Sequence, residues 1–108
     1  MRLYGGIDLH SNNAFVVIVD SDGVVRYRRR LANDLEKILS ALDRFRCDLS
    51  GIAIESTYNG YWLIDGLQAA GHRVHLATPS AIKQYGKHSA DAEDAEQLAT
   101  LLRLKVLP

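Results

Sequence analysis

The sequence has a single cysteine, Cys47, so it cannot form a disulfide within the chain. No His or Cys stands at zinc-ligand spacing from Cys47, and we expect a packed, inert thiol in a reducing cytoplasm. The 13 basic and 13 acidic residues cancel, so no global positive field attracts nucleic acid. No apolar run reaches transmembrane length, and Asp8 interrupts the apolar segment near the amino terminus. These absences exclude a disulfide scaffold and a membrane span, and we expect a soluble, intracellular chain.

The composition is that of an ordinary globular domain. With 108 residues, 47% hydrophobic and 24% charged, the chain can bury a core of single-domain size. The sequence contains no repeats and no low-complexity segment. Residues 101–107 still have the pattern of an apolar helix where the chain ends. We therefore expect residues 1–108 to be the amino-terminal fragment of a longer protein.

Apolar segments predict five strands. Residues 3–9 are a short apolar segment bounded by polar residues, which predicts a buried strand, and residues 14–19 are apolar on both faces, as in a central strand. The Asp-Gly turn that follows residue 19 predicts a hairpin to a third strand over residues 24–30. Shorter strands are expected over residues 51–55 and 73–77.

Helices are expected between and after the later strands. Asn33, with Glu36 three residues later, resembles a capping box and predicts a helix start. A second helix opens at Gly60 and is stopped by Gly71. A short helix over residues 80–85 and a longer one over about 91–104 follow.

The order β-β-β-α-β-α-β-α predicts an α/β fold. Right-handed crossovers place the later strands beside the first. The result is a mixed five-stranded sheet, three antiparallel strands and then two parallel ones, flanked by helices. Two fold families begin this way, the ribonuclease H-like nucleases and the actin-like ATPases.

Two acidic residues lie at the ends of predicted buried strands, Asp8 in the first and Glu55 in the fourth. The carboxyl ends of neighbouring parallel strands meet at one edge of a sheet, where ligands bind in α/β folds. A buried carboxylate is costly unless it is paired or bound to metal. Either residue alone could be a solvated strand end, but the two together indicate a site.

Asp91 and Asp94 add a second pair, three residues apart on one helix face. That face continues through Ala95, Leu98 and Leu101, which are expected to be buried. Alternatively, Asp91 caps the helix and Asp94 favours its positive end. Four converging carboxylates call for a divalent cation, and oxygen-only ligands favour Mg²⁺ or Mn²⁺ over zinc. Such ions can clamp the attacking and leaving oxygens of a phosphoryl displacement, so we predict phosphodiester cleavage or strand transfer.

The sequence contains, in order, Gly6-Ile7-Asp8, Glu55-Ser56-Thr57 followed by Gly60-Tyr61-Trp62, and Asp91-x-x-Asp94-Ala95 followed by Leu98-Ala99. This ordered set resembles the DEDD-type transposases of insertion sequences, relatives of the pilin-gene invertase whose amino-terminal domain is similar to a Holliday-junction resolvase. The resemblance covers essentially the whole chain. It implies that residues 1–108 are a ribonuclease H-like catalytic domain of a DNA transposase or recombinase. The metal-binding and catalytic tetrad would be Asp8, Glu55, Asp91 and Asp94.

The resemblance also implies partners and a setting. In this family a structured bridge RNA guides the enzyme to target and donor DNA, and a second, carboxyl-terminal domain carries a serine nucleophile. We therefore expect a homo-oligomer for the longer protein, little activity for the isolated domain, and work at the nucleoid of a prokaryotic cell, with no membrane partner. The chain departs from the family pattern at Ser89, where the family often has lysine.

Two basic groups are candidates for contacts with nucleic-acid phosphates. One lies on the predicted third strand, where alternation places three arginines on one face, although charges on an edge strand also prevent aggregation. The other precedes the helical acid pair. The candidates are Arg26, Arg28 and Arg30 on the strand, and Lys83, Lys87 and His88 before the helix.

Three other functions stay open from the residues. An actin-like or sugar-kinase-like ATP-binding half-domain would also carry an Asp after its first strand, but its phosphate loop needs glycine, and residues 9–13 contain none. A non-catalytic nucleic-acid-binding module on the same fold is disfavoured by the intact acid set. A classical three-acid transposase is disfavoured by the Asp-x-x-Asp pair.

Overall fold

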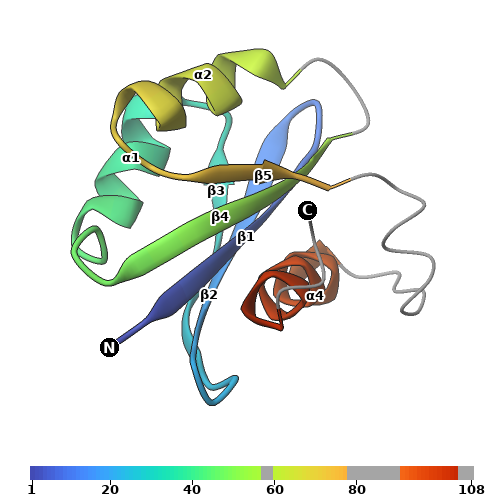
Figure 1. Ribbon diagram of the computed structural model, residues 1–108. Coiled ribbons are helices and arrows are strands. Elements are labelled where there is room, and N and C mark those ends of the chain that lie inside the picture. Colours follow the sequence, from blue (N-terminus) through green and yellow to red (C-terminus); the bar gives the residue numbers. More distant parts are fainter. Residues whose placement is uncertain (57–59, 78–90, 105–108) are drawn as a thin grey trace.

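Five strands and three helices make up the described part of the chain (Figure 1). The computed structural model describes residues 1–56, 60–77 and 91–104, with the backbone alone for residues 56 and 91–94. In chain order the elements are β1 (Leu3–Leu9), β2 (Asn13–Asp20), β3 (Val25–Ala32), α1 (Leu35–Asp43), β4 (Leu49–Ser56), α2 (Tyr61–Ala69), β5 (Val74–Leu76) and α4 (Asp91–Arg103). The short helix expected over residues 80–85 lies outside the described residues.

The strands form one mixed sheet in the order β3-β2-β1-β4-β5. The first three strands pair in antiparallel fashion, while β4 pairs parallel with β1 and β5 pairs parallel with β4. This confirms the predicted α/β sheet of three antiparallel and two parallel strands. It also confirms that the carboxyl ends of β1 and β4 are neighbours.

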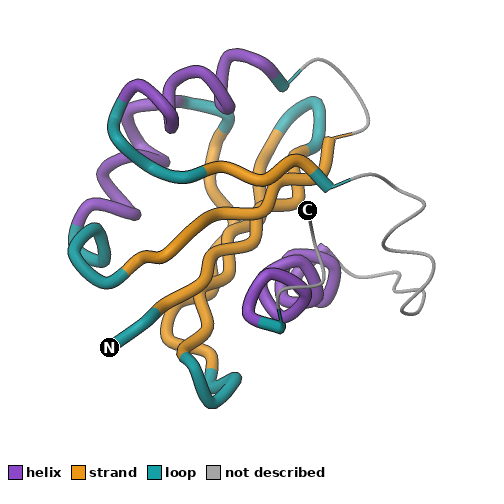
Figure 2. Tube along the Cα trace, in the orientation of Figure 1, coloured by secondary structure: helices purple, strands orange, loops and turns teal. Residues whose placement is uncertain are grey.

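Helices cover both faces of the sheet (Figures 1 and 2). Helices α1 and α2 pack on one face, and α4 is the one described helix on the other, mainly across β1 and β2. Both faces of the central strands are therefore buried, which explains why β2 is a continuous apolar run rather than an alternating one. The core under α1 and α2 includes Ile7, Val16, Ile18, Ile38, Leu42, Ile52, Ile54, Leu63 and Leu67. The core under α4 includes Val17, Val19, Ala53, Ala95, Leu98, Ala99, Leu101 and Leu102.

The start of α1 differs from the prediction by one residue. The N-cap is Asp34, whose carboxylate accepts a hydrogen bond from the backbone N–H of Lys37 at 3.3 Å. Asn33, one residue earlier, instead donates its side-chain amide to the backbone carbonyl of His10 at 2.7 Å. The predicted capping box is therefore wrong, since Asn33 ties the helix entry to the β1–β2 turn.

Cys47 is also placed differently from the prediction. Helix α1 ends at Asp43, and Cys47 lies in the turns that lead into β4, where it is exposed. The expected packed thiol is wrong because the segment after the helix runs over the surface. Among the described helices, none combines the length and the apolar character needed to cross a membrane.

The β2–β3 hairpin is organised by the buried carboxylate of Asp20. Its Oδ1 accepts the backbone N–H groups of Asp22 at 2.9 Å and Val24 at 3.0 Å, and its Oδ2 pairs with the Arg26 guanidinium at 2.7 Å. Gly23 has a φ of 83°, which suits the turn that these bonds close. The N–H of Val24, helped by Arg26 and Asp22 against the opposing effect of burial, holds the pKa of Asp20 below its usual value.

We expect Asp20→Asn to remove stability at neutral pH and to flatten the acid limb of the stability profile. A carboxylate with a lowered folded-state pKa stabilises the fold above its unfolded pKa of about 3.9, and this contribution is lost as the pH falls through the folded value. The check is the midpoint of thermal unfolding between about pH 7 and pH 2.5, where wild type and variant should converge at the acid end. Asp22→Asn, an exposed neighbour in the same turn, should follow wild type. Parallel curves for Asp20→Asn and wild type would contradict this account.

Candidate active site

Asp8 and Glu55 are register partners on β1 and β4 at the carboxyl edge of the sheet. Partners on adjacent strands lie about 4.8 Å apart and point to the same face. This is the face that α4 covers, because Gly6 and Ala53, two residues earlier on each strand, lie under that helix. Asp8 is 3% exposed, whereas Glu55 is partly buried. The predicted proximity of these two strand ends is confirmed.

Helix α4 brings the second acid pair to the same edge. The helix begins at Asp91 and packs on β1 through Ala95, Leu98 and Ala99, which are fully buried. Its other end reaches the β2–β3 turn, where the guanidinium of Arg103 donates to the backbone carbonyl of Ser21 at 3.3 Å. The helix therefore runs from the carboxyl edge of β1 towards its amino edge. Positions 91 and 94 are in line with the buried stripe by the helical repeat, and their side chains lie outside what the structure describes.

The close fit between α4 and β1 depends on Gly6. A Cβ atom at this position would lie 2.7 Å from the backbone N of Ala99 and closer still to the backbone carbonyl oxygen of Ala95. Only a residue without a side chain allows the helix backbone to approach the strand this closely. The small residues at 95 and 99 complete the contact. The depth of this packing fixes the start of α4 relative to Asp8.

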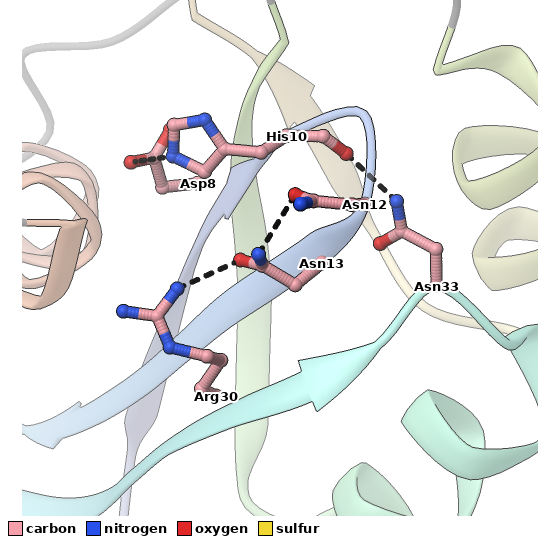
Figure 3. Close-up of polar contacts among 6 residues, drawn as sticks. All are labelled: Asp8, His10, Asn12, Asn13, Arg30 and Asn33. Atoms are coloured by element: carbon pink, nitrogen blue, oxygen red, sulfur yellow. Dashed lines mark hydrogen bonds and ion pairs between the residues drawn. The ribbon is translucent and has the colours of Figure 1, made fainter.

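His10 holds the carboxylate of Asp8 from the β1–β2 turn (Figure 3). Its ring Nε2 lies 2.9 Å from Asp8 Oδ2, in position to donate a hydrogen bond, and the His10 side chain is 35% exposed. The turn is held in place because the N–H of His10 donates to the carbonyl of Asn13 at 2.8 Å, and Asn33 donates to the carbonyl of His10. This contact was not among the predictions from the sequence. The signal for the contact was the two-residue spacing, which places His10 on the same face as Asp8.

Arg28 and Arg30 of β3 are on the same face of the sheet as Asp8. A register shift between β2 and β3 falls at Arg26, so strict alternation, which predicted the three arginines on one face, does not extend to this residue. In the sheet register, Arg30 pairs with Phe15, and Phe15 pairs with Asp8. Two strand spacings of about 4.8 Å place Arg30 about 10 Å from Asp8. Arg28 pairs with Val17, which packs under α4.

Their side chains differ in what they contact. Arg30 lies over the Phe15 ring at 5.4 Å from its centroid and donates to Asn13 Oδ1 at 3.0 Å (Figure 3). Arg28 is exposed, with no hydrogen bond or ion pair to any described residue. Arg26 is paired with Asp20 and is therefore part of the hairpin.

The second predicted basic group, Lys83, Lys87 and His88, lies outside the described residues. Among the side chains that the structure does describe, no three His, Cys, Asp or Glu residues gather as a metal-binding group. Of the predicted tetrad, the structure describes the side chains of Asp8 and Glu55. For Asp91 and Asp94 it describes only the backbone, in α4.

Comparison with known proteins places the chain. A family model described as "Transposase", for DEDD transposases of the IS110 type, matches residues 5–107. The chain belongs to this family. In fold it is similar to RuvC of T. thermophilus, solved in complex with a Holliday junction substrate, with a TM-score of 0.74 and 13% identity over 99% of this chain and 98% of that chain. No curated protein matches the chain.

The two comparisons confirm the family and the fold that were predicted from the sequence. The likeness to RuvC shows the ribonuclease H-like fold. The transposase family is the one that the ordered carboxylate motifs resemble, and membership in it supports DNA cleavage and recombination rather than ATP binding as the function of the fold.

Proposed function

We propose that this domain performs divalent-metal-dependent phosphodiester cleavage and strand transfer in DNA transposition. One observation carries the proposal: two carboxylates are register partners on adjacent parallel strands, at the edge of the sheet where α4 begins with Asp91. Membership in a transposase family supports the reaction class.

The residues present fit a divalent cation of the magnesium type. Asp8 and Glu55 offer carboxylate oxygens on one face of the sheet, and oxygen ligands favour Mg²⁺ or Mn²⁺. Asp8 is nearly buried, and a buried carboxylate calls for cationic or hydrogen-bonding compensation.

In this proposal the four acids hold the metal, which when bound polarises the phosphoryl oxygens and stabilises the developing charge. Asp8 and Glu55 contribute from the rigid sheet, while Asp91 and Asp94 contribute from the first turn of α4. His10 keeps one oxygen of Asp8 oriented, as residues that hydrogen-bond to a metal ligand commonly do. The exposed guanidinium of Arg28, together with Arg30, would contact the phosphate backbone of DNA on the β3 side of the site.

We further propose the partners that the family resemblance implies. DNA is the substrate, and the RuvC structure in complex with a Holliday junction is consistent with nucleic acid binding on this fold. A structured guide RNA would select the DNA, and the serine nucleophile would come from a second domain of a longer, homo-oligomeric protein that works at the nucleoid. The 108-residue domain alone would then bind metal but transfer strands poorly.

Binding of Mn²⁺ to the 108-residue chain tests the metal site. We expect Asp8→Asn to weaken Mn²⁺ binding at least about tenfold, because loss of even a hydrogen-bonding partner of a metal ligand typically costs 10- to 100-fold. The free Mn²⁺ signal in electron paramagnetic resonance measures this directly. Crystals soaked in Mn²⁺ should show an anomalous peak beside Asp8 and Glu55.

The matched control is Asp20→Asn, which neutralises the other buried aspartate of the described chain at the opposite end of the sheet. It should leave the Mn²⁺ affinity unchanged once folding has been confirmed. Equal Mn²⁺ affinity for wild type and Asp8→Asn, or an anomalous peak elsewhere, would refute the metal site.

A further inference from the structure

A cleft opens on the α4 face of the sheet, at the end opposite the carboxylates. Its volume is about 560 Å³. The floor is formed by Tyr4 of β1 and Gly51 of β4, which are register partners. One wall is Leu102 at the end of α4, and the other is formed by Arg73 and His75 at β5. Arg2 also lines the cleft.

Gly51 keeps the floor of the cleft open. A Cβ atom there would lie 3.3 Å from His75 Nε2 and 3.4 Å from Leu102 Cδ2. Both walls therefore come within contact distance of this one backbone position. A ligand on the floor would meet the Gly51 backbone, the imidazole edge of His75 and the apolar side of Leu102.

The charge of the cleft is positive. Arg2 and Arg73 are both exposed, and neither guanidinium makes a hydrogen bond or ion pair with any described residue. None of the described residues that line the cleft is acidic. This differs from the β2–β3 turn, where the guanidinium of Arg26 is neutralised by Asp20. Two guanidinium groups at one concave site, neither paired with a described residue, suit an anion with several oxygens, such as a phosphate group.

The cleft lies on the same face of the sheet as the Asp8–Glu55 pair. Gly51 and Glu55 are on the same face of β4 and four residues apart. At 3.3 Å per residue, about 13 Å therefore separates the floor of the cleft from Glu55. The cleft and the Asp8–Glu55 pair are therefore on one face of the domain. Ala53, between them on β4, is buried under α4, so a strand of nucleic acid held at the carboxylates would have to pass beside this helix to place a phosphate in the cleft.

We propose that this cleft binds a phosphate of the nucleic-acid backbone, at a distance from the site of cleavage, through Arg2, Arg73 and His75. The choice of nucleic acid as the source of the phosphate rests on the proposed function. The contact would be independent of base sequence, since phosphate contacts position a strand and do not read it.

The test measures binding without metal, so that it does not depend on the proposed catalysis. The 108-residue chain carrying Asp8→Asn is titrated in EDTA with a fluorescently labelled single-stranded DNA and with the same sequence as RNA, at several salt concentrations. Adding Arg2→Gln and Arg73→Gln together should weaken binding about tenfold at about 0.1 M salt. The slope of log K against log salt should fall by about 0.7 to 1.4, as expected for the loss of one or two phosphate contacts on a single strand.

The matched control is Arg29→Gln with Lys37→Gln, which removes the same charge from a groove between β3 and α1. It should leave the affinity and the salt slope unchanged. The DNA and RNA arms show which polynucleotide supplies the phosphate, and loss of binding in either arm supports the proposal. The proposal is overturned if the cleft variant binds both polynucleotides like its parent or if the control weakens binding equally. Displacement of the oligonucleotide by an equal concentration of inorganic phosphate would also overturn it. Failure of Mn²⁺ to bind would count against the catalytic proposal and leave this result unaffected.

Discussion

Replacing Gly6 with alanine is expected to destabilise the protein by about 3 kcal/mol or more, near the upper end of the cost of overpacking a core. The added methyl group would lie 2.7 Å from the backbone N of Ala99 and would overlap the carbonyl of Ala95. Backbone atoms of a helix cannot rotate away as a side chain can. The variant must therefore lift α4 from the sheet, and with it much of the core formed by Ala95, Leu98 and Ala99.

Gly5→Ala is the matched control for this prediction. It makes the same chemical change one position earlier on the same strand, and so on the opposite face of the sheet. There the nearest atom to the new methyl group would be the side-chain Cγ1 of Ile52 at 3.3 Å, which can give way by a small adjustment. Urea unfolding should show a loss for Gly6→Ala that is at least about 2 kcal/mol larger than any loss for Gly5→Ala. Equal stability of the two variants would show that α4 does not depend on Gly6.

The same substitution connects the packing to the proposed chemistry. Helix α4 supplies Asp91 and Asp94 to the carboxyl edge, so a shift of its axis moves two acids relative to the two on the sheet. Mn²⁺ binding by folded Gly6→Ala should consequently be weakened, whereas Gly5→Ala should bind like wild type. Metal binding thus reports on helix position separately from stability.

Much of the fold could be predicted because the local signals and the tertiary packing agree. The continuous apolar run of β2 indicates a strand buried on both faces, and the structure covers it with α4 on one side and with α1 and α2 on the other. The Asp-Gly turn could be predicted because the tight turn needs a residue with positive φ, which Gly23 supplies. The capping residue of α1 could not be predicted from spacing, since the use of Asn33 by the β1–β2 turn is a contact across 23 residues.

The site was predictable where it depends on strand periodicity. Asp8 and Glu55 stand out because each interrupts an apolar strand, and parallel pairing then makes them neighbours. The role of Gly6 was not predictable in the same way, because the glycine occurs in a strand and its helix partner is almost 90 residues away. The cleft beside Arg73 and His75 was missed for a related reason. Its walls come from β5 and α4, so the cleft depends on how two separate elements pack.

In the longer protein that we propose, Asp8→Asn and Glu55→Gln should each lower DNA cleavage at least about 100-fold, since loss of an outer partner of a metal ligand alone costs 10- to 100-fold. Both substitutions keep the size of the side chain and remove its negative charge, so the sheet should fold as before. The double variant should be little worse than either single variant, because residues that act as one catalytic unit are strongly non-additive. Single-turnover cleavage of a DNA substrate in Mg²⁺ measures this, and Asp22→Asn, exposed in the β2–β3 turn, provides the control. Full cleavage by Asp8→Asn, or losses that multiply in the double variant, would show that the two carboxylates do not share a metal.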